Sequence, residues 1–308
     1  MLVAELQIPS NKSRIITLDD MYNSLNQLGT YGFVIACEED YHDRVMHAVN
    51  DILKTIKSKR IIFLAGPSGS AKTTTANRIK EQLENYGVPV LRISMDDYFL
   101  SLSDRVNIKS YESPKCVDWD TLTNHLYELL EGHKVRSRIY NFVRGISELG
   151  PIISLPTNGV IICEGIHALN PDLFNKFKGI CKGIYVAPRT RIENQDRKIL
   201  HPQDLRLARR ILRDSRTRGR GVTQIMKQAI SVDKGEALYI TPFKEKASIH
   251  IDTSLDYEIC VISKILHQTG YIYEMNKDSL LYEILSVVPR YIGEKHVPQN
   301  SILKEFIG

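Results

Sequence analysis

The sequence predicts an α/β fold of three layers, in which helices cover both faces of a mainly parallel sheet. Short apolar runs bounded by turn signals recur along the chain, and helix-like segments separate them. Strands of a parallel sheet are buried on both faces, so they read as continuous apolar runs. The runs lie at residues 61–65, 88–94, 160–163, 183–187 and 249–252.

We expect three parts along the chain. A small N-terminal appendage at 1–55 precedes the layered domain, which we place at 56–266, and a C-terminal tail at 267–308 follows it. Within the appendage, the residues at 32–36 predict a strand. The residues at 40–57 predict a helix, because their apolar side chains recur on one helical face.

Composition restricts the class of protein. The 308 residues are 43% hydrophobic and 25% charged, which is typical of a globular protein. No secretory signal or membrane-spanning run is apparent, so we expect a cytoplasmic protein without a membrane partner. The five cysteines are widely spaced, without a CxxC pair, and indicate reduced thiols. The net charge of +5 is mild, but many arginines lie in one stretch.

The most specific motif follows the apolar run at 61–65. It reads Gly66-Pro67-Ser68-Gly69-Ser70-Ala71-Lys72-Thr73, and a helix-like segment from Thr74 to Tyr86 comes next. In such a loop, glycines let backbone N–H groups turn toward phosphate oxygens, while the lysine supplies charge and the hydroxyl ligates magnesium. The turn could be purely structural, but a strand, a Lys-Thr pair and a helix in register favour nucleotide binding. Ala71 replaces the usual glycine, so a positive φ there would be strained.

Two strand ends carry carboxylates. Asp96 and Asp97 follow the run at 88–94, and Glu164 follows the run at 160–163. Ligands bind at the carboxyl edge of an open parallel sheet, where such groups can orient an acceptor hydroxyl or hold Mg2+. The aspartates could instead cap a turn, and a lone glutamate is usually solvated. With the glycine-rich loop in the same chain, we favour the functional interpretation and a P-loop NTPase-type fold.

A stretch at 206–220 is rich in arginine. Its arginines are Arg206, Arg209, Arg210, Arg213, Arg216, Arg218 and Arg220. They recur at helical spacing, so one helix face is cationic. Because a guanidinium suits phosphate oxygens, we expect an arginine-rich helical lid that closes over a transferring group. A solvated face and a nucleic-acid patch are alternatives. The stretch has no aromatic residue, so we do not expect a nucleic-acid partner.

Taken in order, these motifs resemble the uridine kinase family, whose members are phosphate-loop nucleoside kinases related to phosphoribulokinase. Besides the loop, the resemblance is carried by Ser94-Met95-Asp96-Asp97-Tyr98-Phe99, Tyr111-Glu112-Ser113-Pro114-Lys115-Cys116-Val117-Asp118, Tyr140-Asn141-Phe142-Val143, Cys163-Glu164-Gly165-Ile166 and the run from Arg206 to Arg220. The ends of the chain resemble a longer family form, in which additional N-terminal domains precede the kinase domain.

The resemblance implies roles for the matching residues. Asp96, Lys72 and Arg213 would be catalytic, with Asp96 activating the 5′-hydroxyl of a nucleoside. The metal-side groups would be Thr73, Asp96 and Glu164. ATP would contact Gly66, Pro67, Ser68, Gly69, Ser70, Ala71, Lys72, Thr73, Thr74 and Arg218. The nucleoside would contact Asp96, Tyr111, Glu112, Tyr140, Arg210, Arg213 and Arg220.

Departures from the family pattern fall on the acceptor side. Glu112 replaces a sugar-binding aspartate, Ser113 replaces its neighbouring histidine, and Gly145 stands in place of a base-contacting histidine. Hydrogen bonds to a base decide which nucleoside a kinase accepts, since an unpaired buried polar group costs about 1–3 kcal/mol. The phosphate-side residues follow the pattern almost completely.

We therefore predict a kinase that uses ATP and Mg2+ to phosphorylate a nucleoside, with uridine or cytidine as the expected acceptor, in pyrimidine salvage. GTP in place of ATP and a homo-oligomer are compatible with the sequence. One alternative is a kinase for another hydroxylated metabolite, such as a sugar phosphate. The other is a catalytically inactive regulatory module that binds nucleotide or RNA.

Overall fold

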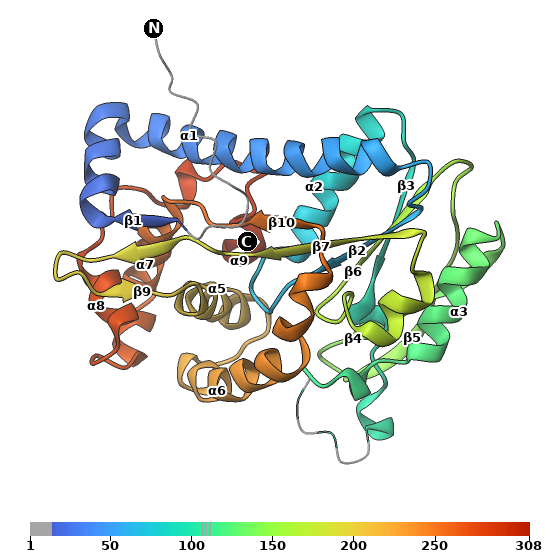
Figure 1. The fold of residues 1–308 in the computed structure, drawn as a ribbon. Helices are drawn as coiled ribbons and strands as arrows, with labels where there is room; N and C mark the ends of the chain where they lie inside the picture. Colours follow the sequence, from blue (N-terminus) through green and yellow to red (C-terminus); the bar gives the residue numbers. More distant parts are fainter. Residues whose placement is uncertain (1–13, 106–107, 109, 111) are drawn as a thin grey trace, which may run out of the picture.

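The computed structural model describes residues 14–105, 108, 110 and 112–308 (Figure 1). Its main sheet has five strands in the order β10-β7-β2-β6-β3, and every neighbouring pair is parallel. The strands are β2 (Ile61–Ala65), β3 (Val90–Ser94), β6 (Val160–Glu164), β7 (Cys181–Ala187) and β10 (Ile249–Asp252). The predicted α/β class and its mainly parallel sheet are confirmed.

Both faces of this sheet are covered. In β2, Ile62 and Leu64 point into a core shared with one set of helices, while Ile61 and Phe63 point into a second core on the other face. The first set comprises α1 (Leu18–Thr55), α2 (Lys72–Asn85), α5 (Pro202–Thr217), α7 (Glu258–Gln268) and α8 (Leu280–Val287). The other face is covered by α3 (Trp119–Leu130) and the short α4 (Pro171–Phe174). This arrangement gives the three predicted layers.

The strand predicted at 32–36 is wrong, because these residues lie within α1. The helix starts much earlier than predicted, at a capping box formed by Thr17 and Asp20, and it is kinked at Gly29. It belongs to the same hydrophobic core as β2. The division of the chain into three parts stays a prediction.

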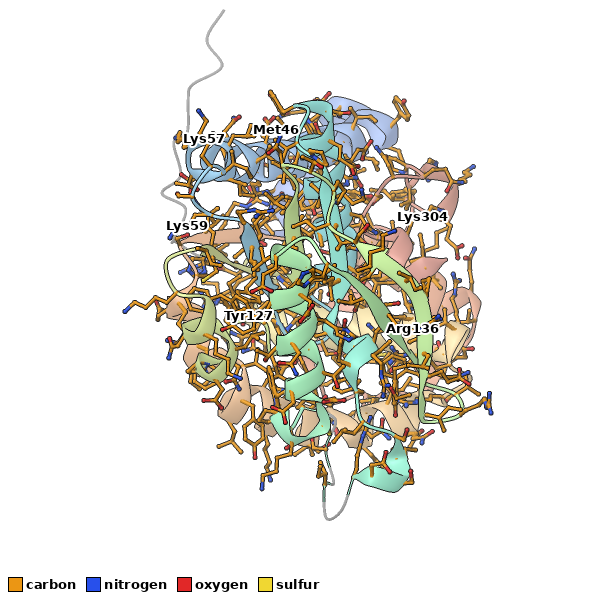
Figure 2. The ribbon with its side chains drawn as sticks, turned by 90° about the vertical axis from the view of Figure 1, so that its right-hand side faces the viewer. Met46, Lys57, Lys59, Tyr127, Arg136 and Lys304 are labelled. Atoms are coloured by element: carbon orange, nitrogen blue, oxygen red, sulfur yellow. The ribbon has the colours of Figure 1, made fainter. Side chains whose placement is uncertain are left out.

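Two smaller sheets were not predicted. The strand β1 (Ile15–Thr17) pairs with β8 (Arg191–Glu193), which also pairs with β9 (Ile199–Leu200). The strands β4 (Lys134–Asn141) and β5 (Ile146–Ser154) form an antiparallel hairpin. Figure 2 shows the hairpin, with Arg136, beside α3, with Tyr127, on one face of the molecule.

The C-terminal residues return to the main core. The long helix α6 (Val222–Tyr239) follows α5, and the chain ends with α9 (Lys304–Ile307). Phe306 and Ile307 are buried in the core that also contains α2 and α5. Figure 1 places the C-terminus close to the middle of the molecule, near α9. Among the described residues, no helix has the length and apolar character needed to cross a membrane.

Candidate active site

The glycine-rich loop joins the end of β2 to α2, as the sequence predicts. At Gly66, a Cβ atom would collide with the carbonyl oxygen of Val186, so only glycine fits. Gly69 and Ala71 both have positive φ, at 76° and 62°. Ala71 therefore adopts the left-handed conformation that disfavours a Cβ, and the loop keeps this strain immediately before Lys72.

Arg206 of α5 holds the loop from one side. Its guanidinium donates two hydrogen bonds to the carboxylate of Glu236, at 2.6 and 2.8 Å, and one to the carbonyl of Ser68, at 3.1 Å. Glu236 also accepts a bond from the backbone N–H of Ser68, at 3.2 Å. Both charged side chains are buried. This neutral pair positions the loop, and Glu236 balances the charge of Arg206.

Arg209, one turn further along α5, makes the equivalent contact with the next loop residue. It donates to both carboxylate oxygens of Glu258, at 2.7 and 2.9 Å, and to the carbonyl of Gly69, at 3.1 Å. The side chain of Arg209 is 0% exposed and that of Glu258 is 1% exposed. Two buried ion pairs thus hold consecutive carbonyl groups of the loop.

The predicted metal-side groups meet below the loop. The hydroxyl of Thr73 donates to Glu164 at 3.1 Å, and Arg92 donates to the same carboxylate oxygen at 3.2 Å. Burial and the charge of Asp96 raise the pKa of Glu164, while Lys72 and Arg92 oppose the shift. A hydroxyl and carboxylate oxygens are hard ligands, so this group of donors fits Mg2+. Thr73, Asp96 and Glu164 would hold the ion.

Of the three metal-side residues, Asp96 also lines a cavity of about 290 Å³. The cavity is lined by Ser68, Lys72, Asp96, Phe99, Ser110, Glu112, Phe142, Ile166, Arg210, Arg213, Asp214, Arg218, Arg220, Gln228, Ser231 and Val232. The structure therefore brings the predicted lysine, the first aspartate after β3 and the lid arginines to one space. A second cavity, of about 720 Å³, is lined by Pro67 of the loop and by Arg206. None of the residues predicted to be catalytic lines this second cavity.

Three of the four lid arginines that line the cavity share one carboxylate. Asp214 lies 2.9 Å from Arg213, 3.3 Å from Arg218 and 3.7 Å from Arg220. Burial lowers the pKa of Arg210 and of Arg218, and the charge of Arg213 adds to the effect at Arg218. Partly desolvated cations that outnumber the nearby carboxylates make a site for an anion.

The two aspartates after β3 have different surroundings. Asp96 lines the cavity, whereas Asp97 accepts a hydrogen bond from the backbone N–H of Tyr140 in the hairpin, at 3.3 Å. Burial raises the pKa of Asp97, and the Tyr140 N–H opposes the shift. Asp97 therefore links β3 to the hairpin, and Asp96 is the carboxylate available to a ligand.

The predicted substrate residues are only partly at the cavity. Glu112 lines it and accepts a hydrogen bond from the hydroxyl of Ser110 at 2.6 Å. Gly235 of α6 allows this approach, because a Cβ there would lie 2.5 Å from the Cβ of Glu112. Tyr111 lies outside the described residues. Tyr140 is buried behind the lining, where its hydroxyl accepts a bond from Arg105 at 2.8 Å.

Two phenylalanines separate Tyr140 from the cavity. Phe142 packs edge-to-face against Tyr140, with 4.9 Å between ring centroids, and Phe99 does so at 5.6 Å. Arg218 lies over the Phe142 ring, 5.3 Å from its centroid. Gly145, at the turn of the hairpin, has a φ of 68°, and any Cβ there would collide with Leu102. No side chain from this position can contact a base.

Sequence reasoning missed several lining residues. Phe142 could have been predicted, because it belongs to the stretch that carries the family resemblance. Asp214 was also visible within the arginine-rich stretch, but nothing in its spacing predicts that it pairs with three arginines. Gln228 and Ser231 of α6 gave no signal, since ordinary polar residues on a helix are usually solvated.

Comparison with known proteins identifies the family of the chain. The model of the Phosphoribulokinase / Uridine kinase family matches residues 61–259. The chain belongs to this family. It is therefore an ATP-binding P-loop kinase, a phosphotransferase with an alcohol group as acceptor, and family members use Mg2+.

Individual relatives are moderately similar. A uridine kinase from Halobacterium salinarum is 32% identical over 195 residues, which are 62% of this chain and 78% of the relative. A uridine kinase from Bacillus licheniformis is 29% identical over 225 residues, or 70% of this chain and 98% of the relative. Among solved structures, a "possible uridine kinase" from Bacillus stearothermophilus has a TM-score of 0.41 and 23% identity, covering 46% of this chain and 79% of that one.

Proposed function

We propose that the protein transfers the γ-phosphoryl group of ATP to the 5′-hydroxyl of a nucleoside, with uridine or cytidine as the acceptor. The observation that carries the proposal is the cavity, where Asp96 lies with Lys72 and the lid arginines. A carboxylate and several cations are what phosphoryl transfer to a hydroxyl requires. The two uridine kinases described above support a nucleoside as acceptor.

On the phosphate side, catalysis is positioning and charge stabilisation. Lys72 and the guanidinium groups of Arg210 and Arg213 would face the terminal phosphates as negative charge moves during transfer. Arg218 would contact ATP, and its contact with Phe142 joins the phosphate side to the acceptor side. Mg2+ would neutralise phosphate charge and would be held by Thr73, Asp96 and Glu164.

On the acceptor side, Asp96 would accept the proton of the attacking hydroxyl. Glu112, held by Ser110, is placed to bind the sugar hydroxyls. Phe99 and Phe142 offer aromatic surfaces on which a base can stack. Since Gly145 supplies no side chain, discrimination between bases would rest on Gln228 and Ser231 of α6, which line the same cavity.

The decisive experiment measures ADP release with a panel of nucleosides and sugar phosphates, first with ATP and then with GTP. We expect Asp96→Asn to lower kcat by about 10²–10⁴-fold, because a positioned general base contributes this much. Asp97→Asn is the matched control, since its amide oxygen can still accept the N–H of Tyr140. Equal activities of the two variants would refute the role of Asp96.

A second candidate, phosphorylation of a sugar phosphate, is favoured by one observation. Gly145 has no side chain to contact a base, and Leu102 fills the space beside it. The cavity is also rich in arginine, which suits a phosphorylated acceptor. ADP release with sugar phosphates and none with nucleosides would establish this alternative.

A further inference from the structure

The C-terminal helix brings a carboxylate to the first turn of α2. The hydroxyl of Thr74 donates to Glu305 Oε2 at 2.6 Å, and the backbone N–H of Thr74 donates to the same oxygen at 3.4 Å. The next N–H, that of Thr75, is already bonded within the helix to the carbonyl of Ala71, at 3.0 Å. Glu305 thus accepts hydrogen bonds from both donors of Thr74, its backbone N–H and its hydroxyl.

These donors are ones that a nucleotide needs. The N–H groups in the first turn of a helix have no partner within the helix and carry partial positive charge, so they bind anions. In the proposed function, the loop and the start of α2 hold the phosphates of ATP. A carboxylate and a phosphate oxygen cannot both occupy the donors of Thr74, and their charges repel each other.

We infer that Glu305 is an internal competitor of the nucleotide: its carboxylate occupies the donors of Thr74 until a phosphate displaces it. The inference rests on the proposed function, because it assumes that Thr74 contacts nucleotide phosphate. It predicts that the wild-type protein binds nucleotide more weakly than its loop alone would allow.

The rest of the C-terminal segment keeps the carboxylate near its target. Phe306 packs beneath Arg209, with 5.0 Å between the guanidinium carbon and the ring centroid. Arg216 of α5 donates to the carbonyl of Ile307, and both Phe306 and Ile307 are buried. Because these anchors do not involve the carboxylate, only the half-buried side chain of Glu305 must rotate to admit a phosphate. The competitor therefore stays close to the site after it is displaced.

The test is the binding of ADP with Mg2+ to the full chain, measured by titration calorimetry. Glu305→Gln removes the charge at nearly constant shape, and we expect the Kd to fall about tenfold, as for the loss of one charge-assisted contact that opposes binding. Glu305→Asp, which keeps the charge on a shorter side chain, should bind less tightly than Glu305→Gln. Glu294→Gln is the matched control, because it removes the same charge from the same segment, at a residue that pairs with Arg216.

Each outcome decides between roles. Weaker binding by Glu305→Gln would show that Glu305 helps to bind the nucleotide, and an unchanged Kd would show that it only caps α2. Either result overturns the inference. Lys72→Ala separates this question from the proposed function. If Lys72→Ala binds ADP as the wild type does, the proposed phosphate site fails. If it abolishes binding while Glu305→Gln has no effect, only the inference fails.

Discussion

Two groups of arginines in the stretch from Arg206 to Arg220 differ in how their charge is balanced. Arg206 and Arg209 each pair with a buried glutamate of their own, Glu236 and Glu258. The arginines that face the cavity have far less compensation, since three of them share Asp214. The first group is neutral overall and holds the loop, whereas the second keeps positive charge for a ligand. The same residue type at the same spacing thus serves structure or binding, according to the carboxylates that surround it.

The largest effect is expected from removing a charge of the loop-holding group. Arg209→Met should lower the free energy of unfolding by about 3–5 kcal/mol, because Glu258 would remain buried without a partner. Urea denaturation followed by circular dichroism measures this loss. The double variant Arg209→Met with Glu258→Leu should recover most of it, since apolar side chains can replace a buried ion pair. If the single variant is as stable as the wild type, the comparison between the two groups is wrong.

The second prediction concerns the cavity-facing group. Arg213→Met should lower kcat by about 10²–10³-fold, the usual cost of one group that stabilises charge in the transition state. The free energy of unfolding of Arg213→Met should differ from that of the wild type by less than about 1 kcal/mol. The Arg213 side chain is partly exposed, and its partner Asp214 still pairs with Arg218 and Arg220. Steady-state ADP release and urea denaturation of the same samples measure both quantities. Arg216→Met, on the same helix but outside the cavity lining, is the control for kcat.

The sequence predicted the central fold well for a physical reason. Strands buried on both faces read as apolar runs, and all five runs are strands of the main sheet. The strand predicted at 32–36 failed because Phe33 and Val34 are apolar neighbours that a helix kinked at Gly29 also buries. The hairpin was missed because Leu149 and Ile152 of β5 are exposed, so no buried run marks that strand.

The candidate site was predictable where the motif is local. The loop and the carboxylates at strand ends follow from short stretches of sequence. The division of the arginines does not, because Glu236 and Glu258 lie 30 and 49 residues beyond the arginines that they neutralise. The different surroundings of Asp96 and Asp97 also depend on a distant element, the hairpin that supplies the N–H of Tyr140.

The smallest effect is expected from Asp214, the carboxylate on which the cavity-facing group depends. Asp214→Asn would leave Arg213, Arg218 and Arg220 without a shared counter-charge, but these side chains reach solvent and can be hydrated there. Asp214 itself is buried, but asparagine has nearly the same shape and leaves no unpaired negative charge, so we expect stability to fall by only about 1 kcal/mol. Because the freed guanidinium groups are less well positioned, kcat should fall about tenfold.

Binding should respond differently from turnover. Asp214→Asn makes the cavity more positive, so the Kd for ADP should stay the same or decrease, although kcat falls. Calorimetry and steady-state kinetics on one preparation separate these quantities. If the variant binds ADP much more weakly, Asp214 does more than position the arginines. If Asp214→Asn loses as much stability as Arg209→Met, the two groups of arginines do not differ in charge balance. Both groups would then stabilise the fold as buried ion pairs.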